Sequence, residues 1–298
     1  EAMVLAVSTQ GAVVVGDDFG DGLDGGSAEH LASSLKTQAS QVWLTTRRPE
    51  TARAFEVPEL VRVSRRGGVR LTSRAATPSD KKEVAAQRHV QGQLLPALTA
   101  TTVVVVEGRH DLTTLAAADR RAVTPRLPLS AHGARLVSAD NGEGGGGSQI
   151  PRIAVLAKSL GFRVVALIDG DPEKKSAEVV ADIQAACDAV VRLPERMAIE
   201  RAILAGASSS DLRAAAAVLT EFGQQDPTDG QVDDQLGDLI MRSLHKSGLH
   251  EPFLVALTES TSTLPPVLGD ALDAVASVAS LDYAGQHMID LTFASPAD

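Results

Sequence analysis

The spacing of apolar residues changes repeatedly along the chain. Short apolar runs bounded by turn residues alternate with segments in which apolar residues recur every three or four positions. The runs predict buried strands and the wider spacing predicts amphipathic helices. The predicted strands are residues 11–16, 41–46, 102–107, 134–139, 162–169 and 188–194, and the predicted helices are 27–39, 49–55, 78–98, 111–120, 151–160 and 174–187.

Three other segments complete the predicted organisation. Residues 59–73 form two alternating runs around Gly67-Gly68, which predicts a hairpin. Residues from about 195 to 250 have mainly helical spacing, and the last 45 residues show no clear pattern. Alternation of strands and helices is typical of an α/β fold with a parallel sheet, so we expect an α/β block to residue 76, a helix over 77–98, and a second domain over 99–298 with a helical insertion at about 195–250.

Composition narrows the class of protein. The chain has 298 residues, 44% of them hydrophobic and 3% aromatic, and it contains no run of eighteen apolar residues that could span a membrane. Its single cysteine, Cys187, excludes an internal disulfide and a cysteine-rich zinc cluster, and fits a cytoplasmic protein. We therefore expect a protein without membrane association.

The charge is distributed unevenly. Residues 47–90 hold eleven Lys or Arg and five Asp or Glu, a net +6 in a chain whose formal charge is −10. This segment is either a solvated linker or a surface that faces phosphate groups, and charge alone does not decide between them.

Acidic residues stand at the ends of the two most hydrophobic predicted strands. "VVVVEGRHD" ends in Glu107 and Asp111, and "VVALIDGD" ends in Asp169 and Asp171. Ligands of parallel sheets bind at the carboxyl ends of strands, so neighbouring strands would bring these carboxylates together. Like charges that close need a partner, and Mg²⁺ or Mn²⁺ is the natural one. Taken alone, Asp169-Gly170-Asp171 also fits a helix cap with turn residues, and Glu107 also fits a simple charge at a strand end.

This pair of motifs resembles the Toprim domain, which is found in topoisomerases, bacterial primases and the OLD (overcoming lysogenization defect) nucleases. The resemblance implies a Rossmann-like parallel sheet and divalent metal for breaking or joining phosphodiester bonds. It places the family's glutamate on Glu107, its next aspartate on Asp111, and its aspartate pair on Asp169 and Asp171.

The first block resembles the second half of an ABC-type ATPase, and an ABC half followed by Toprim is the OLD layout. Asp17 falls on the Walker B aspartate, Asp18 on the catalytic carboxylate (usually Glu), and Arg47 on the switch position (usually His). No G-x-x-x-x-G-K-[ST] loop occurs, so this chain should not hydrolyse ATP alone. We expect it to be the C-terminal part of a longer protein that would bring the ATP-binding half.

Two later segments agree with the resemblance. "VVRLPERMAIERAI" puts Glu200 in the place of a further metal-binding carboxylate, and "LHKSGLHEPF" offers Lys246 as a catalytic lysine near the reacting phosphate. A solvated helix face and a surface lysine are the alternatives. Of the seven histidines, none of which has metal-ligand spacing, His110 lies inside the acidic motif and is the best placed to touch substrate. "EGGGGSQ" reads either as an artificial linker or, as we favour, as a natural tight-approach loop.

The resemblance implies a metal-dependent DNA endonuclease or nickase that uses two Mg²⁺ or Mn²⁺ ions and acts as a homodimer. Glu107 would serve as metal ligand or as general acid and base. The only tyrosine, Tyr283, is poorly placed for topoisomerase chemistry, and the lack of a zinc module disfavours a primase. The alternatives are a non-catalytic module that dimerises and bridges DNA beside an ABC ATPase, and a phosphatase-like use of the Asp-x-Asp motif.

Overall fold

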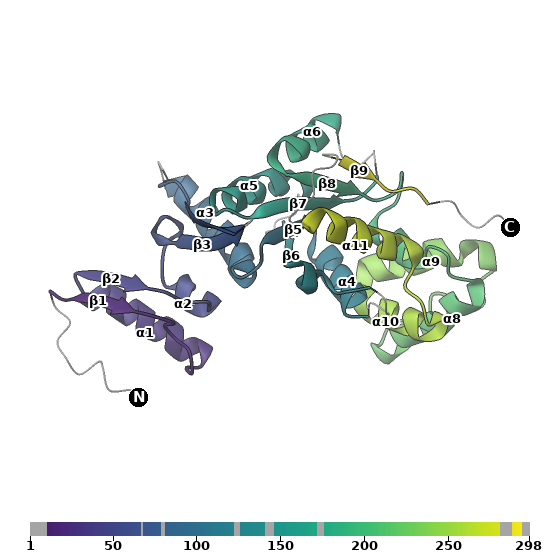
Figure 1. Cartoon of the computed structure of the whole chain (residues 1–298). Coiled ribbons are helices and arrows are strands. Elements are labelled where there is room, and N and C mark those ends of the chain that lie inside the picture. Colours follow the sequence, from purple (N-terminus) through teal and green to yellow (C-terminus); the bar gives the residue numbers. More distant parts are fainter. Residues whose placement is uncertain are drawn as a thin grey trace. The chain divides into compact units, whose positions relative to one another are not determined.

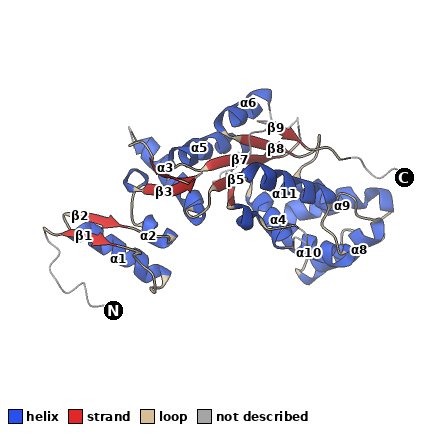
Figure 2. Ribbon diagram, viewed as in Figure 1, coloured by secondary structure: helices blue, strands red, loops and turns tan. Residues whose placement is uncertain are grey.

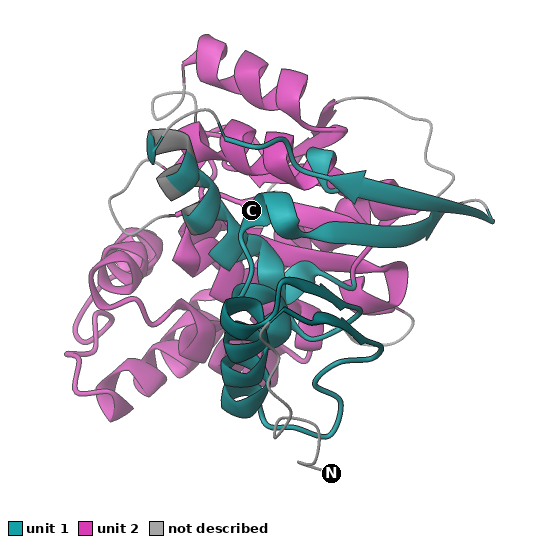
Figure 3. Cartoon of the chain, turned by 90° about the vertical axis from the view of Figure 1, so that its left-hand side faces the viewer, with its two compact units in different colours: residues 1–99, 159–161 teal, residues 100–158, 162–298 magenta. Residues whose placement is uncertain are grey.

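The computed structural model describes residues 11–66, 68–78, 81–121, 126–140, 146–171, 176–280 and 288–293. The chain divides into two compact units (Figure 3). Unit 1 is Glu1–Thr99 with Ser159–Gly161, and unit 2 is Ala100–Lys158 with Phe162–Asp298. Both units combine helices and strands, which confirms the α/β class.

Unit 1 begins with a two-stranded parallel sheet. Strand β1 (Val13–Gly16) pairs with β2 (Gln41–Leu44), and helix α1 (Gly25–Gln38) connects them. Asp24 caps α1 by accepting a hydrogen bond from the Ser27 N–H at 2.9 Å. The helix buries Ala28, Ala32 and Leu35, as its spacing predicts.

One face of this small sheet is exposed. Val15 and Trp43 are register partners and therefore lie on the same face, where they are 78% and 65% exposed. The prediction that both strands are buried is wrong for this face. An apolar run indicates that a strand forms, but the elements around the strand decide whether its second face is covered.

The remainder of unit 1 contains an antiparallel hairpin and several short helices. The hairpin predicted around Gly67-Gly68 is confirmed, with β3 (Val61–Arg66) paired to β4 (Val69–Arg74). The other elements are α2 (Pro49–Arg53), η1 (Val57–Glu59), α3 (Lys81–Leu94) and η2 (Leu95–Ala97). The helix predicted over 78–98 is thus an α-helix followed by a 3₁₀ turn, and it belongs to unit 1.

Unit 2 is built on a five-stranded parallel sheet (Figure 2). The strand order is β6-β5-β7-β8-β9, which confirms the predicted parallel sheet. The strands are β5 (Thr102–Val106), β6 (Ala134–Ser138), β7 (Arg163–Ile168), β8 (Ala189–Arg192) and β9 (Met288–Asp290). All five residues of β5 are buried, as expected for a central strand covered on both faces.

Helices cover both faces of this sheet. Figure 1 shows α4 (Arg109–Arg120) and α11 (Pro266–Ala279) on one face, and α5 (Gly146–Ser159) and α6 (Ala177–Ala186) on the other. The main core cluster contains Val104 and Val106 of β5, Val165 and Leu167 of β7, and the buried face of α11. Alternate residues of the same strands, such as Val105, therefore pack on the opposite face.

Two helices of this layer begin at other residues than predicted. Helix α5 starts at Gly146, five residues before the predicted 151, and contains Pro151. Helix α6 starts at Ala177 rather than 174, because the Ser176 hydroxyl accepts the Val179 N–H and caps the helix there. Residues 172–175 lie outside the described residues, as does Tyr283.

The helical region extends further than its spacing predicts. Helices α7 (Ile199–Leu204), α8 (Ser209–Glu221) and α9 (Asp233–Ser247) fall in the predicted insertion, and α10 (His250–Thr261) and α11 continue to residue 279. Helix α10 packs against α8 and α4. In the part of the chain that the structure describes, no helix combines the length and hydrophobicity needed to cross a bilayer.

Candidate functional site

Glu107 and Asp169 meet at the carboxyl edge of the large sheet. Glu107 follows β5 and Asp169 follows β7, and the two strands are paired in parallel. The Asp169 N–H donates a hydrogen bond of 2.7 Å to Oε1 of Glu107. The expected neighbourhood of the two acidic motifs is therefore present in the fold.

Strand register explains why this contact joins a carboxylate to a backbone group. Val106 is paired with Leu167, so a continued register sets Glu107 beside Ile168 and leaves Asp169 one position further. Side chains at successive positions point to opposite faces of a sheet. The Glu107 carboxylate therefore lies closer to the backbone amide of Asp169 than to the Asp169 side chain.

The turn after Asp169 is fixed by the segment that follows β8. The Gly170 N–H donates to the Met197 carbonyl at 2.9 Å, and the Arg196 N–H donates to the Gly170 carbonyl, also at 2.9 Å. A Cβ at position 170 would overlap the carbonyl oxygens of Leu193 and Pro194. The glycine of Asp-Gly-Asp is thus required by close backbone packing, which sets the positions of the aspartates on either side.

A second glycine lies against Glu107 itself. A Cβ at Gly146, the first residue of α5, would overlap the Glu107 carbonyl oxygen. This close approach explains a glycine in the "EGGGGSQ" tract and supports its interpretation as a natural loop. The first three residues of this tract, 143–145, lie outside the described residues.

Asp111 has a local role at the start of α4. It is the third residue of the helix, and its Oδ2 accepts the Gly108 N–H at 2.8 Å. A carboxylate in the first turn stabilises a helix in this way, so this oxygen of Asp111 has a local capping role.

Asp140, which the sequence pattern did not single out, follows β6 on the other side of β5. The Ala139 N–H donates to the Val106 carbonyl at 2.8 Å, and the Asp140 N–H donates to the Ser138 hydroxyl at 3.1 Å. Asp140 therefore stands at the end of a third neighbouring strand, and its side chain is half-buried. The signal that could have found it is an aspartate directly after a predicted strand.

Glu200 contacts two histidines instead of the strand-end carboxylates. Its Oε1 lies 3.3 Å from Nε2 of His250 and 3.5 Å from Nδ1 of His245. The His250 ring is fully buried and stacks on His110 with 4.5 Å between ring centroids. Four helices, α4, α7, α9 and α10, thus contribute to one cluster. Sequence spacing could not show it, because its members are up to 140 residues apart.

The cluster shifts the pKa values of two of its members. Burial tends to raise the pKa of Glu200, but hydrogen bonds from His250, from its own backbone and from His245, together with the charge of His250, outweigh it and lower that pKa to about 2. The pKa of His110 is lowered by burial and by the neighbouring charge of His250. Nδ1 of His250 is buried without a hydrogen-bond partner among the described residues.

Lys246 lies in the last turn of α9, and its side chain is exposed. It directly follows His245, so the helix end that contributes to the histidine cluster also carries a positive charge. A basic residue at this position also interacts favourably with the carboxyl end of the helix dipole.

The three ATPase-like residues gather at the carboxyl edge of the small sheet in unit 1. The Thr45 hydroxyl donates to Asp17, and the Asp18 N–H donates to the same hydroxyl at 3.0 Å. Nη2 of Arg47 lies 3.9 Å from Asp18 and 3.5 Å from Asp21. Asp18 has a φ of 45°, an uncommon conformation for a residue other than glycine. These residues form a local ion-pair group on an exposed edge.

The strand-end residues of unit 2 have the donor chemistry that a hard divalent cation prefers. Glu107, Asp111, Asp140, Asp169 and Asp171 offer only carboxylate oxygens, which suit Mg²⁺ or Mn²⁺. As the side chains stand, however, no group of three or more His, Cys, Asp or Glu residues within the described ranges is arranged to hold an ion.

The chain matches no protein-family model, and a search of curated proteins finds no match either. The Toprim and ABC ATPase interpretations therefore rest on the motifs alone and stay predictions.

The packing around the Asp-Gly-Asp turn predicts the effect of Gly170→Ala. The substitution should destabilise the protein by roughly 3 kcal/mol or more, because the new methyl group overlaps two carbonyl oxygens. Gly237→Ala is the matched control, since a Cβ there meets nothing within 4 Å and alanine favours the helix. Thermal unfolding followed by circular dichroism should show a lower midpoint for the first variant and an unchanged or higher one for the second. Equal midpoints would contradict the close approach.

The histidine contacts of Glu200 predict a pH-dependent contribution to stability. In metal-free protein at pH 7, Glu200→Gln should lower the free energy of unfolding by roughly 2 kcal/mol. The folded-state pKa of about 2 lies below the ordinary 4.5, so the stabilisation is present above pH 4.5 and is lost as the pH falls towards 2. Urea unfolding at several pH values should show wild type and variant converging in acid.

Glu259→Gln is the control for this measurement, because Glu259 is an exposed residue whose ion pair with Arg121 should contribute less than about 1 kcal/mol. A difference between wild type and Glu200→Gln that does not change with pH would mean that the carboxylate charge of Glu200 does not stabilise the cluster.

Proposed function

We propose that unit 2 is the catalytic region of a metal-dependent DNA endonuclease or nickase. The observation that carries this proposal is the contact between Glu107 and Asp169 at the ends of paired parallel strands. Asp111 and Asp171 belong to the same two strand-end motifs, and Asp140 follows the next strand. A carboxylate edge of this kind is a frequent place for phosphodiester chemistry with divalent metal.

Glu107, Asp169 and Asp171 would hold a first Mg²⁺ or Mn²⁺ ion, and Asp111 with Glu200 would reach a second. When bound, such ions supply a more acidic water and offset the negative charge of the scissile phosphate. Both histidine contacts of Glu200 involve the same oxygen, Oε1. Glu200 therefore also positions His250.

The chain's own residues would orient and neutralise the substrate. The amide of Asp169 holds the Glu107 carboxylate in place, so that Glu107 can accept a proton or bind metal from a fixed position. Lys246 would place a positive charge where the reacting phosphate gains negative charge. The His110 ring, held against His250, would lie at the substrate side of α4.

Unit 1 would serve as the second half of an ABC-type ATPase domain. Asp17, Asp18 and Arg47 would take part in ATP chemistry only beside a phosphate-binding loop, which this sequence lacks. A cytoplasmic homodimer that presents two active sites to opposite DNA strands would cut both strands, and a single active site would nick.

One observation favours a second candidate function. Within the described residues the carboxylates are not arranged to hold a metal ion. A module that bridges DNA without cutting it would not need such an arrangement. Such a module would bind two DNA duplexes at once and would need no divalent metal.

Incubation of the chain with supercoiled plasmid tests the nuclease proposal. Mg²⁺ or Mn²⁺ should produce nicked or linear DNA, EDTA should prevent it, and Glu107→Gln or Asp169→Asn should lower the rate about 100-fold or more. Glutamine at 107 keeps an oxygen to accept the Asp169 N–H, so the fold should be preserved. Glu221→Gln, at the exposed end of α8, is the matched control and should cut like wild type.

Intact plasmid with both metals, from protein with a normal circular dichroism spectrum, would contradict the nuclease proposal. One duplex would then be fixed to beads and incubated with the protein and a second, free duplex. Retention of the free duplex on the beads would favour the bridging module.

A further inference from the structure

The hairpin of residues 61–74, here the basic hairpin, has an unusual charge. It contains five arginines and no Asp or Glu. A solvated ribbon ordinarily mixes both signs, because like charges repel across a narrow sheet. This concentration of positive charge requires an explanation that local folding does not supply.

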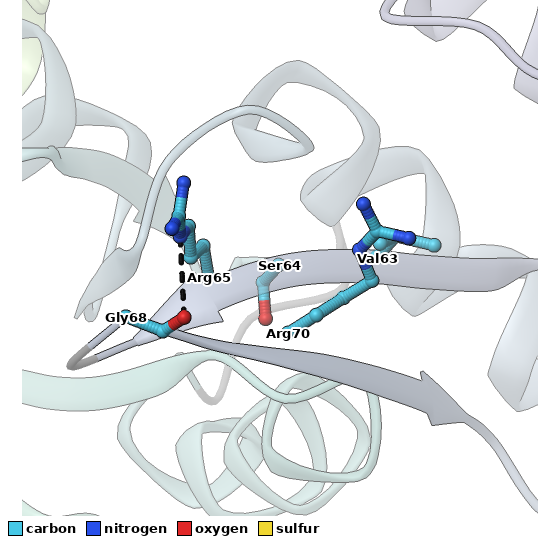
Figure 4. A pocket seen from close by; sticks show the side chains of 5 residues that line it. All are labelled: Val63, Ser64, Arg65, Gly68 and Arg70. Atoms are coloured by element: carbon cyan, nitrogen blue, oxygen red, sulfur yellow. Dashed lines mark hydrogen bonds between the residues drawn. The ribbon is translucent and has the colours of Figure 1, made fainter.

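Two of the arginines are direct neighbours across the ribbon. Arg65 is the register partner of Arg70, so their side chains lie on the same face, as Figure 4 also shows. Among the described residues neither makes an ion pair; Arg65 instead donates from Nε to the Gly68 carbonyl at 3.3 Å. A directly opposed pair of like charges destabilises a hairpin by itself.

Other arginines of unit 1 are neutralised. Arg53 lies 3.2 Å from Glu29, and Arg88 lies 2.6 Å from Glu56. The contrast shows that unit 1 has carboxylates to pair with its arginines, yet none of the described ones faces Arg65 and Arg70.

The opposite face of the ribbon is anchored by Arg62. Its Nη1 donates to the carbonyls of Leu160 and Gly161 at 3.3 and 3.0 Å. Burial lowers the pKa of Arg62, whose guanidinium is used for structure. The anchored face therefore fixes the ribbon and leaves the face of Arg65 and Arg70 outward, where Val63 is 61% exposed.

A hollow of about 450 Å³ lies beside the paired arginines. It is lined by Val63, Ser64, Arg65, Gly68 and Arg70, the residues drawn in Figure 4. Two guanidinium groups beside an open hollow are donors for phosphate oxygens. Carboxylates of a protein partner would suit the arginines too, but a two-stranded ribbon also has the width that the major groove of DNA admits.

We propose that the basic hairpin binds the phosphate backbone of duplex DNA through Arg65 and Arg70. This inference rests on the proposed function in its choice of DNA as the partner. It does not depend on cleavage, because the hairpin belongs to unit 1 and the carboxylate edge to unit 2. The contacts carry no base specificity, so they would hold DNA of any sequence.

Fluorescence anisotropy with a labelled duplex of about 20 base pairs in EDTA tests the proposal without any cleavage. Arg65→Ala/Arg70→Ala should raise the Kd roughly tenfold at low salt and reduce the slope of log Kd against log salt by about 2. Arg65→Lys/Arg70→Lys should recover most of the binding. Arg53→Ala/Arg88→Ala is the matched control, since it removes the same charge from unit 1 at arginines already paired, and should change the Kd less than about twofold.

Equal weakening by the two alanine variants would overturn the proposal, because it would reflect net charge alone. So would wild-type binding by a correctly folded Arg65→Ala/Arg70→Ala protein, or competition by polyglutamate as effective as that by duplex. The two proposals fail separately. Arginine-dependent binding without plasmid cleavage in either metal would contradict only the nuclease proposal. Metal-dependent cleavage with unchanged DNA binding by the Arg65→Ala/Arg70→Ala variant would contradict only the hairpin proposal.

Discussion

The parallel pairing of β5 with β7 is the interaction on which the acidic edge depends. Both strands are buried and rich in Val, Leu and Ile, so their place in the middle of the sheet is set by burial of apolar surface on two faces. Pairing brings the ends of the strands together, and with them Glu107 and Asp169. Backbone packing then restricts the turns that follow, at Gly146 beside Glu107 and at Gly170 beside Pro194. The acidic motifs are therefore held by the core beneath them.

Packing of helices around this sheet produces a second polar group of a different kind. Glu200, His245 and His250 come from three helices and meet beside His110 of α4. A buried histidine is costly unless its polar atoms find partners, and the Glu200 carboxylate supplies one for Nε2 of His250. The same contact keeps the pKa of Glu200 low. The carboxylate that the family resemblance assigns to metal is thus, in this fold, also a structural partner of the histidines.

Among its described residues, unit 1 contains both paired and unpaired arginines. Most of its ion pairs are exposed, and each contributes little to stability. Arg62 is used to anchor the basic hairpin, whereas Arg65 and Arg70 oppose each other without a carboxylate among the described residues. Repulsion of this kind is tolerated where a polyanion relieves it, which links the charge pattern to the proposed binding of DNA.

The sequence by itself determined the α/β class, the parallel sheet, the hairpin, and the arrival of Glu107 and Asp169 at the ends of hydrophobic strands. These features follow from the spacing of apolar residues within short segments and from the burial that this spacing favours. Tertiary structure alone decided that Trp43 is exposed, that Asp140 stands at the same edge, and that Glu200 meets His245 and His250. It also decided that, within the described residues, the carboxylates are not arranged as a metal-binding group. These outcomes depend on which elements pack together and on the direction of side chains beyond the strand ends, and no local pattern encodes either.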